Sequence, residues 1–148
     1  MGRMYTAVAS SAQATAGDIM EIAAPSDAIV VLHSVQVSMS DSETDDSTEI
    51  DISRWATSGS GGSTPTASPM ELSDTAFAGA VEAFNTVDAS STQTKLYSEG
   101  ISMLAGFQKI WTPEMRPIIP PSGIVVVKFT ADITSITMKV TVEFEEIG

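Results

Sequence analysis

Alternation of apolar and polar residues dominates the C-terminal end of the sequence. Between Ile136 and Phe144 every second residue is apolar. The residues between them are polar: Thr137, Lys139, Thr141 and Glu143. A period of two residues buries one face of a β-strand and leaves the other face in solvent. The pattern therefore predicts a terminal strand in a sheet that is packed on one side.

The same pattern predicts strands elsewhere in the chain. It is clearest over residues 28–40, where one face would carry Ile29, Val31, His33, Val35, Val37 and Met39. Residues 48–55 alternate as well, and the acidic turn before them indicates the return strand of a hairpin. Shorter apolar runs predict further strands at residues 18–22, 96–101, 107–111 and 124–129.

The segments between these runs differ in composition. Residues 57–69 are rich in Gly, Ser, Thr and Pro, which predicts a flexible polar loop or an extended excursion. Residues 5–13 are small and polar, which is typical of an irregular strand or an arm, so residues 1–17 are a candidate N-terminal arm. Residues 70–84 have the apolar spacing of a short helix, although Gly79 weakens that interpretation.

Together these patterns predict one all-β domain spanning residues 1–148. We expect about seven or eight short strands with long loops, arranged as a β-sandwich or a jelly-roll-like barrel.

The charge balance narrows the classes of partner. The chain has 19 acidic and 7 basic side chains and a formal net charge of −12. Nucleic acids and anionic membranes attract cationic surfaces, so we expect neither to be a partner. No apolar run reaches the roughly 18 residues that span a bilayer, and the N-terminal residues do not resemble a secretory signal.

Catalytic and metal-binding motifs are missing from the sequence. There is no cysteine, and His33 is the only histidine. A hydrolase triad or a zinc site needs more than this, so we expect no enzyme, no cofactor and no metal site. His33 lies in an alternating strand, which favours a structural role within the sheet.

The acidic turn resembles a calcium loop in part. Asp41, Glu43 and Asp45 fall at positions 1, 3 and 5 of that pattern, but Asp46 stands where Gly is needed and Ile52 where Glu is needed. We interpret residues 41–46 as a solvated turn, with a weak oxygen-ligand cation site as the alternative.

Two tryptophans allow two interpretations. Trp55 and Trp111 could form a stacking platform for a sugar, since aromatic faces suit carbohydrates. The chain has only nine aromatic residues, however, and a sandwich of this size needs some of them in its core or in a subunit interface. Both interpretations stay open at this stage.

Several segments resemble a family of small tailed-phage virion proteins, which we regard as head decoration (cement) proteins. The clearest motif is Pro120-Pro121-Ser122-Gly123-Ile124 leading into a strand, within the longer segment 111–124. The ending Phe144-Glu145-Glu146-Ile147-Gly148 and weaker matches in residues 34–38, 64–65, 72–74 and 97–100 add to the resemblance. The acidic turn is longer than in that family.

The resemblance implies a structural virion protein on the outer capsid surface, synthesised in a bacterial cytoplasm. It would stabilise the shell by bridging major capsid protein subunits, as a homotrimer. The contact residues that we expect are Trp55, Trp111, Arg116 and Ile118, because aromatic residues and arginine dominate protein interfaces. A carbohydrate-binding β-sandwich module, or another virion part such as a head fibre base or tail-tube protein, is the alternative.

Overall fold

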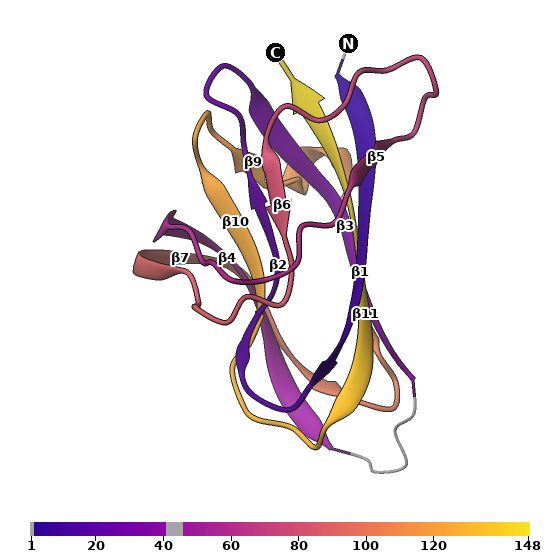
Figure 1. Ribbon diagram of the computed structural model, residues 1–148, viewed down its shortest axis with the longest axis vertical. Coiled ribbons are helices and arrows are strands. Elements are labelled where there is room, and N and C mark those ends of the chain that lie inside the picture. Colours follow the sequence, from indigo (N-terminus) through magenta and orange to yellow (C-terminus); the bar gives the residue numbers. More distant parts are fainter. Residues whose placement is uncertain (1, 41–45) are drawn as a thin grey trace.

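Two antiparallel β-sheets face each other in the computed structural model, which describes residues 2–40 and 46–148 (Figure 1). Sheet A has the strand order β5-β1-β11-β3-β8, and β9 pairs with β3 beside β8. Sheet B has the order β6-β2-β10-β4-β7. The predicted all-β fold is confirmed, and it is a β-sandwich rather than a closed barrel.

The strands are as follows: β1 (Arg3–Gln13), β2 (Gly17–Ala23), β3 (Ile29–Ser40), β4 (Ser47–Thr57), β5 (Ala67–Pro69), β6 (Ala80–Glu82), β7 (Ser90–Ser102), β8 (Phe107–Ile110), β9 (Ile118–Ile119), β10 (Ile124–Phe129) and β11 (Ile136–Ile147). The 3-10 turn η1 (Pro113–Met115) lies between β8 and β9. Three of the strands, β5, β6 and β9, have at most three residues.

The eight longer strands pair in a nested order. β4 pairs with β7, β3 with β8, β2 with β10, and β1 with β11. This order, divided over two sheets, is that of a double-sheet jelly roll. The predicted hairpin of residues 28–40 and 48–55 is wrong, because β3 belongs to sheet A and β4 to sheet B. In this arrangement the apolar face of each strand packs against the opposite sheet.

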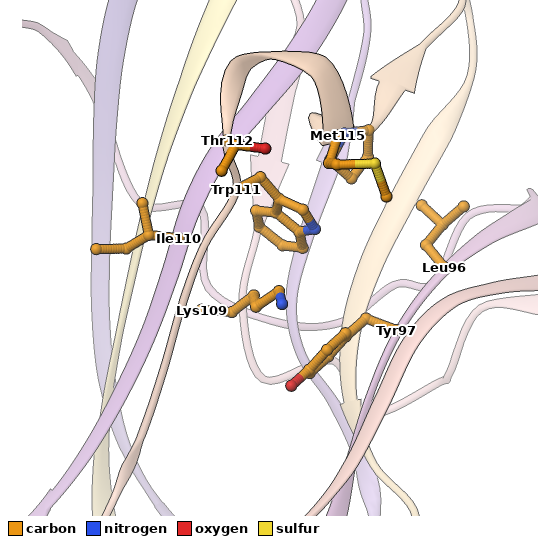
Figure 2. Close-up of a pocket in the computed structure, with 8 residues that line it drawn as sticks. Leu96, Tyr97, Lys109, Ile110, Trp111, Thr112 and Met115 are labelled. Carbon is orange, nitrogen blue, oxygen red and sulfur yellow. The ribbon is translucent and has the colours of Figure 1, made fainter.

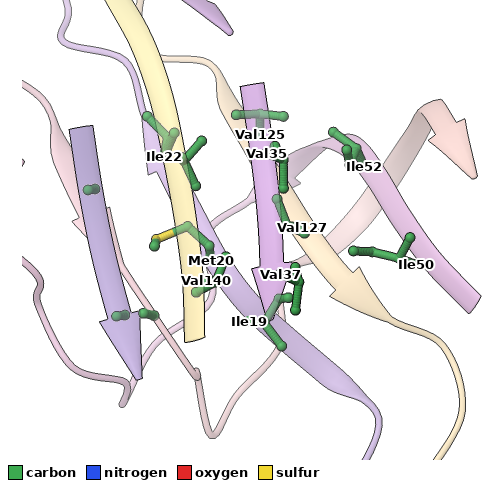
Figure 3. Close-up of a cluster of buried hydrophobic side chains, with 14 of the residues drawn as sticks. Ile19, Met20, Ile22, Val35, Val37, Ile50, Ile52, Val125, Val127 and Val140 are labelled. Atoms are coloured by element: carbon green, nitrogen blue, oxygen red, sulfur yellow. The ribbon is translucent and has the colours of Figure 1, made fainter. Parts of the chain in front are cut away.

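The core lies between the two sheets and follows the predicted alternation (Figure 3). Sheet A contributes Val35, Val37 and Val140, while sheet B contributes side chains such as Ile52 and Val127. On the terminal strand the five apolar positions are buried, as predicted: Ile136, Met138, Val140, Val142 and Phe144. The hydrophobic contact between the sheets is the main force that holds them together.

A bulge in β3 overturns one detail of the predicted pattern. The register with β11 shifts between Glu143 and Phe144, which face Ser34 and Leu32, so His33 is the extra residue. Such an insertion lets two successive side chains leave the same face. His33 and Ser34 consequently both reach carboxylates on the outer side of sheet A, and Leu32 turns into the core.

The N-terminal segment is a regular strand in the interior of sheet A. β1 pairs with β11 from Arg3, opposite Glu146, to Gln13, opposite Ile136. Its small residues suit a crowded interior, since Ala7 is fully buried.

Residues 58–89 form an excursion between β4 and β7. It contains β5, which extends sheet A beside β1, and β6, which extends sheet B beside β2. The predicted helix at residues 70–84 is not formed, because the backbone of Ala80–Glu82 pairs with β2 instead. The excursion therefore covers one side of the sandwich and leaves the opposite side, between β7 and β8, uncovered.

Candidate functional site

The uncovered side of the sandwich holds a groove that we call the edge groove. It lies between β7, the edge strand of sheet B, and β8, the edge strand of sheet A, and has a volume of about 370 Å³. Its lining comes from both sheets and from the turn after β8: Leu96, Tyr97, Lys109, Ile110, Trp111, Thr112, Met115 and Pro117. A cavity of this volume is at the small end of those that bind ligands or anchor side chains.

Aromatic and cationic side chains converge in the edge groove (Figure 2). The Nζ atom of Lys109 lies 4.3 Å from the centre of the Tyr97 ring, which is a cation–π contact. The Tyr97 hydroxyl donates a hydrogen bond to Glu99, and this bond raises the pKa of Tyr97 above its ordinary value. Figure 2 also shows that the side chain of Ile110 points away from Lys109 and Tyr97.

The segment that follows β8 is fixed to sheet A by its backbone. The N–H of Trp111 donates to the carbonyl of His33 at 3.1 Å, and the N–H of Leu32 donates to the carbonyl of Pro117 at 3.0 Å. Between these points η1 is closed by a bond of 2.9 Å from the N–H of Met115 to the carbonyl of Thr112. The wall of the groove is therefore anchored at both ends.

Three large apolar side chains on this wall are exposed, and we call them the apolar rim. They are Ile110, Met115 and Ile118, with 66%, 71% and 51% of their surfaces exposed. They fall within nine consecutive residues, whereas most exposed apolar side chains of a soluble protein are scattered singly. Three exposed apolar side chains in one short segment make this segment a candidate contact surface.

Three of the four predicted contact residues lie on this wall. Trp111 lines the edge groove, Arg116 follows η1, and Ile118 belongs to the apolar rim. Trp55 lies elsewhere, on β4 of sheet B, where its Nε1 donates to Ser53 at 3.0 Å.

The two tryptophans do not form a common stacking platform. Trp111 is only 8% exposed and belongs to the hydrophobic core, as one of the two interpretations of the sequence expected. Trp55 does not line the edge groove; its ring lies 5.6 Å from Nζ of Lys128 on the neighbouring strand β10. The two rings belong to different sheets.

Sequence reasoning missed Tyr97, Lys109 and Met115 as members of the site. One signal was present for Lys109, which stands on the same face of its strand as Phe107. The register places Lys109 opposite the buried Val35, so a cation occupies an inward position at a sheet edge. For Met115 no sequence pattern distinguishes an exposed apolar residue from a buried one.

The outer face of sheet A carries two polar pairs. Nε2 of His33 lies 3.2 Å from a carboxylate oxygen of Glu145, and the hydroxyl of Ser34 donates to Glu143 at 2.7 Å. Each pair joins β3 to β11. His33 is thus hydrogen-bonded within the sheet, which is the structural role that the sequence favoured.

Buried carboxylates hold the excursion against sheet B. Glu21 is 2% exposed and accepts hydrogen bonds from Ser58, from the backbone of Gly59 and from Asn85. Asp18, also 2% exposed, accepts one of 2.5 Å from the backbone of Ala89. Burial raises the pKa of Asp18 above its ordinary value, although the bond from Ala89 opposes that shift.

Two further observations concern metals and membranes. Within residues 2–40 and 46–148, no group of three or more His, Asp or Glu side chains is arranged to hold a metal ion. Asp41, Glu43 and Asp45, the residues of the partial calcium pattern, lie outside the described residues. The described part of the chain also contains no helix with the length and hydropathy that spanning a bilayer requires.

Comparisons of the chain with protein-family models, with curated proteins and with solved structures give no match.

Proposed function

We propose that the protein is a structural, non-enzymatic decoration protein of a phage head, which bridges adjacent major capsid protein subunits on the outer capsid surface. The observation that carries the proposal is the apolar rim. Ile110, Met115 and Ile118 are exposed on a wall that backbone hydrogen bonds hold to sheet A. A rigid surface loses little conformational entropy when it docks, and this favours tight binding.

The resemblance to virion proteins falls on the same part of the molecule. The segment 111–124 that carries its clearest motif contains η1 and β9 and leads into β10. It therefore includes Trp111, Met115, Arg116 and Ile118. The segment that carries the resemblance therefore contains two of the three rim residues, Met115 and Ile118, and the third, Ile110, directly precedes it.

The mechanism that we propose is additive. Each copy would bury a protein interface of ordinary size, about 1,600 Å² in total, against the shell. A homotrimer would engage three such sites at once, and its effective affinity would exceed that of one site. Many copies acting together would raise the resistance of the shell to the pressure of packaged DNA.

Density-gradient sedimentation of the source lysate tests the proposal. The protein should co-sediment with heads at a fixed ratio to the major capsid protein, and Met115→Ser should weaken that association. Sedimentation with detached tails would point instead to another virion part, such as a tail-tube protein. Absence from all particles would overturn the proposal, and a glycan panel would then test the carbohydrate-binding alternative.

A further inference from the structure

Two cations beside the edge groove have no acidic partner among the residues that the structure describes. The chain has 7 Lys and Arg residues against 19 Asp and Glu residues. Ion pairs within the described part of the chain engage Arg3, Lys95 and Lys128, but neither Lys109 nor Arg116. Both cations are therefore available to a carboxylate from outside the chain.

Lys109 is held in position for such a contact. Its strand places it opposite Val35, on the inward side of sheet A, and its Nζ lies over the Tyr97 ring at 4.3 Å. An ammonium has three N–H donors and no acceptor, and a ring face satisfies none of them with a strong hydrogen bond. In Figure 2 the amine lies between Trp111 and Tyr97, within the edge groove.

Arg116 is a second cation next to residues that line the groove. It stands between Met115 and Pro117, both of which line the groove, and it directly follows η1. Its Nε is enclosed and has no hydrogen-bond partner within the described residues. A ligand does not reach that enclosed Nε, but the guanidinium as a whole matches a carboxylate in geometry as well as in charge.

The rest of the groove suits an extended peptide. Trp111, Met115 and Pro117 provide an apolar wall. In the described residues β7 pairs only with β4, and β8 pairs only with β3, so each strand has one unpaired backbone edge. An extended segment satisfies such an edge with its own backbone and places alternate side chains in pockets.

From these contacts we infer that the edge groove binds an extended segment of the shell protein in which a carboxylate lies next to an apolar side chain. The carboxylate pairs with Lys109 and Arg116, and the apolar side chain packs on Trp111 and Met115. The inference rests on the proposed docking function and names the chemistry of the partner at that surface.

The net charge favours a single carboxylate over a polyanion. With a formal charge of −12, the chain repels a nucleic acid, because many phosphates interact with charges over the whole surface. A single carboxylate in contact with Lys109 responds mainly to its nearest charges, because salt screens the others beyond about 8 Å. The groove is thus selective for a short acidic and apolar segment.

Two matched peptide libraries test the inference on the full chain. Both hold short extended peptides with one fixed central residue flanked by randomised aromatic and aliphatic positions; this residue is Asp in one library and Asn in the other. We expect the best Asp peptides to bind at least about tenfold more tightly than their Asn counterparts, since a charge-assisted hydrogen bond is lost. Equal binding of the two libraries, or no binding of either, would overturn the inference.

Substitutions locate the binding site. Lys109→Gln and Arg116→Gln should each reduce the affinity for the best Asp peptide about tenfold and should remove much of its advantage over the Asn peptide. Lys139→Gln is the control. This substitution removes the same charge, but Lys139 lies on β11, away from the groove. An equal loss in the Lys139 variant would show a general charge effect and would contradict the proposed site.

Head binding separates this inference from the proposed function. If the wild type and Lys109→Gln co-sediment with heads equally well and no Asp peptide binds, the proposed decoration function is retained. The inference that the groove binds an acidic segment is then wrong. If Asp peptides bind through Lys109 but the protein is absent from heads, the inferred preference of the groove for a carboxylate is retained. The proposal that its partner is the capsid protein is then wrong.

Discussion

The backbone N–H of Gly59 donates a hydrogen bond of 2.9 Å to Oε2 of Glu21, a carboxylate that the excursion covers almost completely. The excursion is rich in glycine and serine, which by composition alone would predict high mobility. Its attachment depends instead on a few buried acceptors on the outer face of sheet B.

Replacing Glu21 by alanine should destabilise the protein and loosen the excursion. The donors of Ser58, Gly59 and Asn85 would lose their acceptor, which should lower the free energy of unfolding by about 3 kcal/mol. Urea unfolding measures the loss, and limited proteolysis within residues 58–89 reports the loosening. Glu114→Ala, on the exposed turn η1, is the control and should change stability by less than about 0.5 kcal/mol.

The second prediction separates stability from docking on the wall of the edge groove. Trp111 is nearly buried, so Trp111→Ala should lower the free energy of unfolding by about 3–5 kcal/mol. Met115→Ser and Ile110→Ser remove exposed side chains and should change it by less than about 0.5 kcal/mol while weakening association with heads. Calorimetry and head co-sedimentation measure the two effects. Unchanged head binding by both rim variants would contradict the role of the apolar rim.

The third prediction follows from the raised pKa of Asp18. Burial makes the folded protein hold this proton more tightly than the unfolded chain does. Protonated Asp18 therefore contributes its full stabilisation of the folded state below the unfolded pKa, near 3.9. This contribution is lost as the pH rises through the folded pKa. Asp18→Asn removes this titration, so the stability of the wild type should fall relative to the variant as the pH rises above the unfolded pKa. Parallel slopes in urea unfolding would refute this prediction.

The contribution of Asp46 to stability should depend on pH in the opposite direction. Hydrogen bonds from the backbones of Thr134 and Ser47 lower the pKa of Asp46 below its ordinary value. Its contribution is therefore present above the unfolded pKa and is lost as the pH falls through the folded pKa. In the same series of urea unfolding experiments, Asp46→Asn should lie below the wild type at neutral pH and approach it in acid. A difference that grows in acid would exclude this role for Asp46.

A pair of glycines gives the fifth prediction. A Cβ on Gly79 would overlap the carbonyl oxygen of Ala23, whereas a Cβ on Gly100 meets nothing within 4 Å. Gly79→Ala should therefore displace β6 and lower the free energy of unfolding by about 1–3 kcal/mol. Gly100→Ala should leave stability unchanged or raise it slightly, because it restricts the unfolded chain. Thermal unfolding of the two variants provides the comparison.

The sequence predicted the strands better than their partners. Alternation from Ile136 to Phe144 is a local property and identifies the buried face of β11 directly. The pairing of β3 with β8 and β11 depends instead on residues about 70 to 120 positions away along the chain, and no pattern within residues 28–55 contains it. A hairpin is the pairing that local sequence favours for residues 28–55. In the structure the two strands belong to different sheets instead.

The candidate site was predicted only in part for a related reason. Trp111, Arg116 and Ile118 are close in sequence, so one segment brought them together. Tyr97 and Lys109 meet only because β7 and β8 end the two sheets on the same side of the sandwich. Trp55 was grouped with Trp111 on residue type alone, and residue type does not determine which sheet a strand joins.

The nested pairing of strands has a consequence for how the chain folds. Of the four principal pairs, β4 with β7 closes the shortest loop, and β1 with β11 joins nearly the two ends of the chain. Each outer pair costs less loop entropy once the pair inside it has formed. Folding should therefore start at β4 and β7 and proceed outward. Such a route, dominated by distant contacts, is slow compared with that of a helical protein of equal length.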